Sequence, residues 1–164
     1  MVLKFAVYGL GDAGNEIARK AIAKKMDPVA LIDENAGRVG KTSGRIIKLE
    51  KRRMTIITSD DSRALAESEP QIAFHATNAT GIKAARQILE CVKAGASVIT
   101  LSKLPAKTSA TGKKIDSAAT KKKVAVVSVN GIRTPAARAV ALAPRVIASA
   151  RTKPGLKTLA DYVL

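Results

Sequence analysis

The sequence predicts an α/β fold, a doubly wound parallel sheet of about six strands with helices on both faces. Strand-like and helix-like stretches alternate along most of the chain, which is the pattern of such a sheet. Hydrophobic residues make up 46% of the 164 residues and aromatic residues only 2%, so the core is expected to be aliphatic. Aliphatic strands between Ala-rich helices are typical of a sheet that is covered on both sides.

Six short aliphatic runs are predicted to be the strands. They are rich in Val, Ile, Leu and Ala, and Gly, Pro, Asn or Asp residues separate most of them from the next segment. The runs occupy 3–8, 29–33, 54–58, 71–76, 97–101 and 124–129.

Four segments between these runs have apolar residues at helical spacing, as Ile17, Ala21 and Ile22 do in the first. Asp27-Pro28 precedes the second strand as a breaker, and Gly95 ends the third helix. Residues 42–53 show no clear pattern. The predicted helices cover 14–25, 62–67, 82–94 and 110–121.

The pattern changes after Gly131. Residues 135–150 are Ala-rich and helical, with an interruption expected at Pro144, and residues 151–164 are basic and contain Pro154-Gly155. We therefore expect one domain over 1–145 and a basic C-terminal helix or tail over 146–164.

Three glycines follow the first predicted strand in the spacing G-x-G-x-x-G, and a predicted helix follows them. This context is typical of a dinucleotide-binding turn. Gly9 would allow a tight turn, Gly11 would let a pyrophosphate approach the backbone, and Gly14 would let the helix pack on its strand. Asp12 and Ala13 would offer N–H groups at the helix N-terminus. A purely structural turn is the alternative interpretation.

Asp33 ends the second predicted strand, where an acid can accept hydrogen bonds from the adenine-ribose hydroxyls of NAD. Arg38 and Lys41 follow in the next loop and could pair with the 2′-phosphate of NADP, or they are ordinary loop charges. The sequence therefore predicts NAD or NADP as cofactor, with a slight preference for NAD.

The fourth predicted strand ends in His75-Ala76-Thr77-Asn78. Ligands of such sheets lie beyond the carboxyl ends of the strands, so Ala76, Thr77 and Asn78 are predicted to line the nicotinamide-ribose side. His75 could act as a general acid or base, but its position inside the strand favours a buried, hydrogen-bonded residue. Lys103 follows the fifth predicted strand. It could contact the substrate or the cofactor, or it could be a solvated loop lysine.

The chain carries 29 Lys+Arg and 13 Asp+Glu, a net charge of +16, in short clusters at the ends of predicted elements. Such a surface attracts polyanions, but the clusters favour solvated charge over a specific site. Two Phe, two Tyr and no Trp make a base-stacking platform unexpected. Nucleic acid is therefore expected as a non-specific partner only.

The single cysteine, Cys91, excludes an internal disulfide, and together with the single histidine it makes a metal site unexpected. Cys91 lies in a helical apolar pattern and is predicted to be buried. The chain has no apolar run of membrane-spanning length and no signal-peptide pattern at its start. We therefore expect a cytoplasmic protein without membrane contact.

Three motifs together resemble the N-terminal NAD(P)-binding Rossmann domain of 2,4-diaminopentanoate dehydrogenase and, more loosely, of dihydrodipicolinate reductase. The resemblance covers about 4–145. It is carried by Gly9-Leu10-Gly11-Asp12-Ala13-Gly14, by Leu31-Ile32-Asp33 with Gly37-Arg38-Val39-Gly40-Lys41, and by Phe74-His75-Ala76-Thr77.

The resemblance implies hydride transfer at a carbon that bears nitrogen, with NAD or NADP, a small amino-acid-like substrate and a homo-oligomer such as a dimer. In that family a second domain supplies most substrate contacts. This sequence ends at Leu164, so the substrate domain is expected to be absent and no catalytic residue is assigned. A stand-alone dinucleotide-binding module with a regulatory or interaction role is the alternative.

Overall fold

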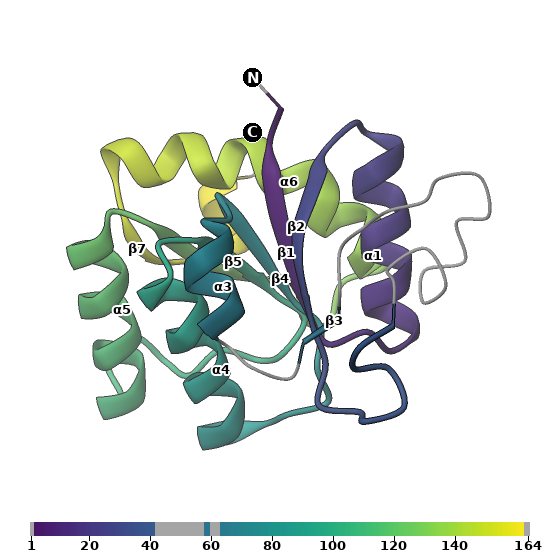
Figure 1. Ribbon diagram of the computed structural model, residues 1–164. Coiled ribbons are helices and arrows are strands. Elements are labelled where there is room, and N and C mark those ends of the chain that lie inside the picture. Colours follow the sequence, from purple (N-terminus) through teal and green to yellow (C-terminus); the bar gives the residue numbers. More distant parts are fainter. Residues whose placement is uncertain (1, 42–57, 60–62, 163–164) are drawn as a thin grey trace.

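The computed structural model describes residues 2–41, 58–59 and 63–162, which form one parallel sheet between two layers of helices (Figure 1). This confirms the predicted doubly wound α/β fold. The strands are β1 (Lys4–Tyr8), β2 (Asp27–Ile32), β3 (Thr58–Ser59), β4 (Ile72–His75), β5 (Ser97–Thr100), β6 (Ala125–Ser128) and β7 (Gly155–Lys157). The helices are α1 (Asp12–Ala23), α3 (Arg63–Ser68), α4 (Gly81–Lys93), α5 (Ala110–Lys122) and α6 (Pro135–Thr152), and a short 3-10 helix, η1, covers Leu159–Tyr162.

The order of the strands across the sheet is β3-β2-β1-β4-β5-β6-β7. The chain therefore starts in the middle, winds outward through β2 to β3, and then crosses to β4 on the other side of β1. Tyr8, the last residue of β1, pairs with Ile32 of β2 and His75 of β4. The carboxyl ends of β1, β2 and β4 thus meet where the winding reverses, which is where open α/β sheets bind ligands.

Each face of the sheet has its own aliphatic core. Helices α1 and α6 pack on one face, together with Phe5 and Val7 of β1. Helices α3, α4 and α5 pack on the other, together with Ala6 and Tyr8. Alternate residues of β1 are therefore buried on opposite sides, as expected for a covered parallel sheet. Cys91 is fully buried in the second core, as predicted.

The N-terminal half differs from the prediction in two details. Strand β2 already begins at Asp27, so Pro28 lies inside it rather than before it. The pairing register with β1 shifts beside Pro28, between Phe5 and Ala6, which is consistent with the missing N–H of proline. The predicted strand 54–58 falls largely outside the described residues. Of this region the structure describes Thr58 and Ser59, which form β3.

The C-terminal segment is more regular than expected. Helix α6 runs without interruption through Pro144, which is exposed to solvent, so the proposed boundary at residue 145 falls inside a helix. Part of the expected tail then forms β7 beside β6. Two contacts anchor this strand: the Gly155 N–H donates to the Val124 carbonyl (2.8 Å), and the Leu156 N–H donates to Asp116 Oδ1 (2.8 Å).

Helices in the described part of the chain are too short or too polar to cross a membrane.

Candidate functional site

A cleft of about 540 Å³ opens at the carboxyl ends of β1, β2 and β4. Seven of the predicted cofactor residues line it, namely Gly9, Gly11, Asp33, Arg38, Ala76, Thr77 and Asn78. The other four lie around it. Asp12 and Ala13 begin α1, Gly14 is buried beneath the turn, and Lys41 is exposed at the end of the described loop.

The three glycine positions of the turn differ in whether the fold itself requires a residue without a side chain. Gly9 has φ +98°, and a Cβ there would lie 2.7 Å from the Ala76 carbonyl oxygen. A Cβ on Gly14 would overlap the carbonyl oxygen of Gly9, so this glycine lets α1 sit directly on the turn. At Gly11, by contrast, the described residues leave open space for at least 4 Å around the Cβ position. Gly9 and Gly14 are thus needed by the fold, whereas the fold does not require a glycine at position 11.

The first turn of α1 has unused hydrogen-bonding capacity. Its N-cap is Gly11, and the helix start has no side-chain cap, so backbone N–H groups at this end remain available for an anion. Asn15 has a buried side-chain oxygen without a hydrogen-bond donor among the described residues. Buried acceptors are rarely left unpaired. The uncapped helix start fits a site that a phosphate-bearing ligand completes. The Asn15 oxygen instead needs a donor, such as a hydroxyl group or a water molecule.

Asp33 supports the turn from the end of β2. Its carboxylate is 6% exposed and accepts the Leu10 N–H at 2.7 Å and the Asn35 N–H at 2.7 Å. Arg38 Nη1 adds an ion pair at 3.1 Å. A carboxylate has about four lone-pair positions, so these three donors leave capacity for one ribose hydroxyl.

A second acid, Glu34, links the two sides of the cleft and was not anticipated from the sequence. Its Oε2 lies 2.8 Å from Lys83 Nζ, and its Oε1 accepts from Gln87 Nε2 at 3.0 Å. The bond from Lys83 lowers the pKa of Glu34. Lys83 and Gln87 are four residues apart on α4 and so share one face. That spacing was visible in the sequence, but the partner on the far side of the cleft was not.

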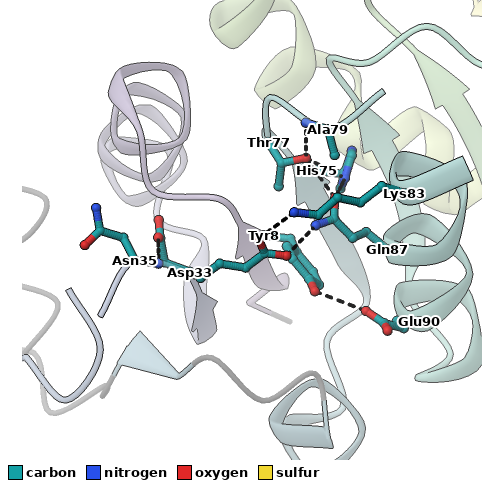
Figure 2. A network of polar contacts seen from close by, with 10 residues as sticks. Tyr8, Asp33, Asn35, His75, Thr77, Ala79, Lys83, Gln87 and Glu90 are labelled. Atoms are coloured by element: carbon teal, nitrogen blue, oxygen red, sulfur yellow. Dashed lines mark hydrogen bonds and ion pairs between the residues drawn. The ribbon is translucent and has the colours of Figure 1, made fainter. Parts of the chain in front are cut away.

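His75 is buried at the centre of a polar chain beneath the cleft (Figure 2). Its Nδ1 lies 2.8 Å from Thr100 Oγ1, and its Nε2 lies 2.9 Å from Gln87 Oε1. The Gln87 amide nitrogen donates onward to Glu34, so its Oε1 faces the histidine and accepts from Nε2–H. Nδ1 then accepts the Thr100 hydroxyl. Burial lowers the pKa of His75 and so favours the neutral ring, and both ring nitrogens are engaged in hydrogen bonds.

Tyr8 forms part of the cleft wall beside this chain. Its hydroxyl donates to Glu90 Oε2 at 3.1 Å. Burial, followed by the charge of Glu90, raises the pKa of Tyr8, so the phenol stays protonated. The neutral forms of Tyr8 and His75 are thus both favoured by burial.

A second cavity of about 790 Å³ adjoins the cleft through the loop after β4. Its wall includes Leu101, Leu104 and Pro105 after β5, together with Lys103 and Asn130. Lys103 is thus beside the neighbouring cavity and not in the cleft itself. Among the described residues no group of three or more His, Cys, Asp or Glu side chains could hold a metal ion.

Comparison with solved structures places this fold among dehydrogenases. An amine dehydrogenase from Mycobacterium smegmatis is 26% identical, with a TM-score of 0.71 over 77% of this chain and 38% of that one. Homoserine dehydrogenases from S. aureus and Thiobacillus denitrificans are 14% and 15% identical, each with a TM-score of 0.54. They match 78% and 79% of this chain and 32% and 29% of their own, and at this identity they show the fold alone.

No protein-family model and no curated protein matches the chain. The specific likeness to diaminopentanoate dehydrogenase and dihydrodipicolinate reductase therefore stays a prediction. The chain spans about 38% of the length of the amine dehydrogenase. What the comparisons support is a Rossmann-type domain of the kind that dehydrogenases contain.

Proposed function

We propose that the chain binds NAD or NADP in the cleft at the ends of β1, β2 and β4. One observation carries this proposal: the open space at Gly11, beside an uncapped helix start, at the reversal point of the sheet. The pyrophosphate would lie against Gly11 and the N–H groups of Asp12 and Ala13. The adenine ribose would reach Asp33, and the nicotinamide ribose would lie near Ala76, Thr77 and Asn78.

Arg38 supports use of NADP as well as NAD. Its guanidinium neutralises Asp33 at 3.1 Å and also lines the cleft, and Lys41 lies farther along the same loop. A 2′-phosphate of NADP could therefore pair with Arg38, and it would not face an unneutralised Asp33 carboxylate.

Binding of the cofactor is tested by calorimetry and thermal shift at low salt with NAD⁺, NADH, NADP⁺ and NADPH. We expect a dissociation constant in the micromolar range for at least one form. Gly11→Ala should keep the melting temperature and weaken binding at least tenfold, because its methyl group enters only the open space. Gly9→Ala is the contrasting variant and should lower the melting temperature itself. Absence of binding by all four forms, or unchanged binding by a folded Gly11→Ala protein, would contradict the proposal.

The reaction that the bound cofactor serves is proposed to be hydride transfer at a carbon bearing nitrogen. The likeness to a protein called an amine dehydrogenase and the sequence resemblance both support this class. The second cavity, beside the expected nicotinamide end, offers space for a small substrate. The bound cofactor would supply the hydride chemistry, and this chain would orient it. The test is amine-dependent formation of NADH or NADPH, measured by absorbance.

The alternative is a dinucleotide-binding module without turnover. It rests on the same open space at Gly11, which cofactor binding without turnover would also explain. This alternative predicts the same binding as above with no amine-dependent signal. Activity that disappears in Gly11→Ala would overturn it.

A further inference from the structure

We propose that the edge of the sheet formed by α5 and β7 binds the phosphate backbone of a nucleic acid, independently of the dinucleotide cleft. We call this surface the basic edge. It comprises Lys107, Lys113, Lys114, Lys121, Lys122, Lys123, Arg151, Lys153 and Lys157.

The positive charge of the chain is concentrated in its last two-fifths. Residues 101–164 hold thirteen lysines and arginines and two aspartates, a net charge of +11 out of the total +16. The remaining hundred residues have sixteen basic and eleven acidic side chains and are nearly balanced by comparison. The clusters that look dispersed along the sequence therefore belong mainly to one part of the fold.

The pairing of β6 with β7 brings two of these clusters together. The Gly155 N–H donates to the Val124 carbonyl at 2.8 Å, so the run at 121–123, just before β6, lies beside Arg151 and Lys153, just before β7. Helix α5 packs against β7 along the same edge (Figure 1). At the opposite end of β7, Lys107 and Lys157 both line one groove of about 550 Å³.

The two acids in this region are engaged in bonds that hold the structure. Asp116 accepts the Leu156 N–H at 2.8 Å and pairs with Lys107 at 3.2 Å. Asp161 accepts the Thr158 N–H at 2.7 Å. Of the nine cations of the basic edge, Lys157 is half-buried and the other eight are exposed.

The arrangement of charge on α5 is not the one that helix stability favours. The first turn of α5 has no acidic residue, and Lys113 and Lys114 follow at its fourth and fifth positions. Cations near a helix N-terminus oppose the helix dipole, whereas those near the C-terminus favour it. Lys121 and Lys122 in the last turn therefore stabilise the helix, whereas Lys113 and Lys114, at the end of the first turn, do not. The charges of Lys113 and Lys114 remain available to a bound polyanion.

The rest of the surface favours phosphate over other polyanionic partners. All four Phe and Tyr side chains are buried, at 0% to 5% exposure, so bases cannot stack on them and protein partners find no aromatic anchor. The exposed large hydrophobic residues of the described chain are Val2 and Ile82, neither of them on the basic edge, so an anionic membrane would find no apolar side chain to insert. Recognition would therefore be electrostatic and independent of base sequence.

The length of α5 matches a short stretch of double-stranded nucleic acid. Helix α5 has 13 residues and is therefore about 20 Å long, which corresponds to roughly six base pairs at about 3.4 Å each. The basic edge lies at β7, three strands from β4 and the dinucleotide cleft. Binding should thus be unaffected by saturating NADH.

The test compares two variants that remove the same charge from different faces. Lys114→Gln, Lys121→Gln, Lys122→Gln and Lys153→Gln are combined in the edge variant. Lys4→Gln, Arg19→Gln, Lys24→Gln and Lys93→Gln are combined in the control, all exposed and outside the basic edge and the cleft. Anisotropy of a labelled duplex, measured over a salt series, gives the affinity and its salt slope.

We expect the edge variant to bind at least tenfold more weakly. The magnitude of its salt slope should fall by roughly 3.6, at about 0.9 for each of the four lost phosphate contacts. The control variant should lose less than threefold, and both should keep the wild-type melting temperature. Equal losses in the two variants, or no binding by the wild-type protein at low salt, would overturn the proposal. So would equally tight binding of polyglutamate or of phosphatidylglycerol vesicles.

Discussion

At the scale of single residues, two acidic side chains at the end of β2 have different tasks. Asp33 is buried and fixes the glycine turn, whereas Glu34 is exposed and reaches across the cleft to Lys83 and Gln87. The guanidinium of Arg38 pairs with Asp33 and lines the cleft beside it. Under the proposed binding mode, the choice between NAD and NADP is therefore expected to depend on Arg38 more than on Asp33.

Replacement of Arg38 by alanine should separate the two cofactors. We expect NADPH to bind at least tenfold more weakly, since a hydrogen bond to a charged group contributes about 1.5–3 kcal/mol. NADH should bind as before or more tightly, because the Asp33 oxygen is freed for the ribose. Calorimetry with both cofactors measures the ratio, and Lys93→Ala serves as a control. An equal loss for NADH and NADPH would show that Arg38 does not contact the 2′-phosphate.

His75 should make stability depend on pH in a narrow window. Burial lowers its pKa in the folded protein, while the unfolded chain takes up the proton below its usual value of about 6.5. The free energy of unfolding should therefore be fully maintained above pH 7 and fall as the pH drops through 6.5. The slope cannot exceed about 1.4 kcal/mol per pH unit for one group.

Urea unfolding between about pH 5 and 7 measures this slope, and His75→Gln should remove it. His75 is the only histidine, and carboxylates such as Glu34 titrate at lower pH. A change in the free energy of unfolding in this pH range can therefore be assigned to His75. The single imidazole resonance in NMR reports its pKa directly. A value above 6.5 would contradict the burial argument.

The residues that sequence reasoning identified are those with a local pattern. Gly9, Gly11 and Gly14 have fixed spacing, and Asp33 and Thr77 follow aliphatic runs, so each could be placed at a strand end. The bridge from Glu34 to Lys83 joins residues 49 positions apart. Local periodicity contains no information about such a pair.

At the scale of elements, β7 depends on side chains from elsewhere in the chain. It has three residues, and its Gly155 has φ +112° with Asp116 Oδ1 at 2.6 Å from where a Cβ would be. The same Asp116 accepts the Leu156 N–H. Three residues are too few for a hydrophobic pattern, which is why the sequence predicted a tail here. Pro144 was expected to interrupt α6, but it is exposed and removes only one backbone donor.

Removal of the Asp116 carboxylate should loosen β7. Asp116→Ala leaves the Leu156 N–H without its acceptor and should cost about 1.5–3 kcal/mol in the free energy of unfolding. Asp116→Asn keeps an oxygen for that N–H and loses only the partly exposed pair with Lys107, so it should cost less than about 1 kcal/mol. Denaturant unfolding gives both values, and hydrogen exchange at Leu156 localises the change. Similar costs for the two variants would show that this bond does not hold the strand.

At the scale of the whole molecule, a net charge of +16 on 164 residues makes the folded state repel itself. Salt shortens the range of that repulsion, from about 30 Å at 0.01 M to about 10 Å at 0.1 M. The melting temperature should therefore rise over this range of NaCl. The rise should be smaller in the edge variant than in the control variant, because the repulsion is concentrated at the basic edge. A melting temperature that falls with salt would contradict this account.

The central position of β1 also has a consequence for how the chain acquires its structure. Phe5 pairs with Pro28 on one side and with Ile72 on the other, so β1 is synthesised well before its second neighbour, β4. During that interval a nascent aliphatic edge is open to other chains. Such distant pairings also slow folding. We therefore expect folding to depend on chaperones and refolding yield to fall with protein concentration, although the native sheet is covered on both faces.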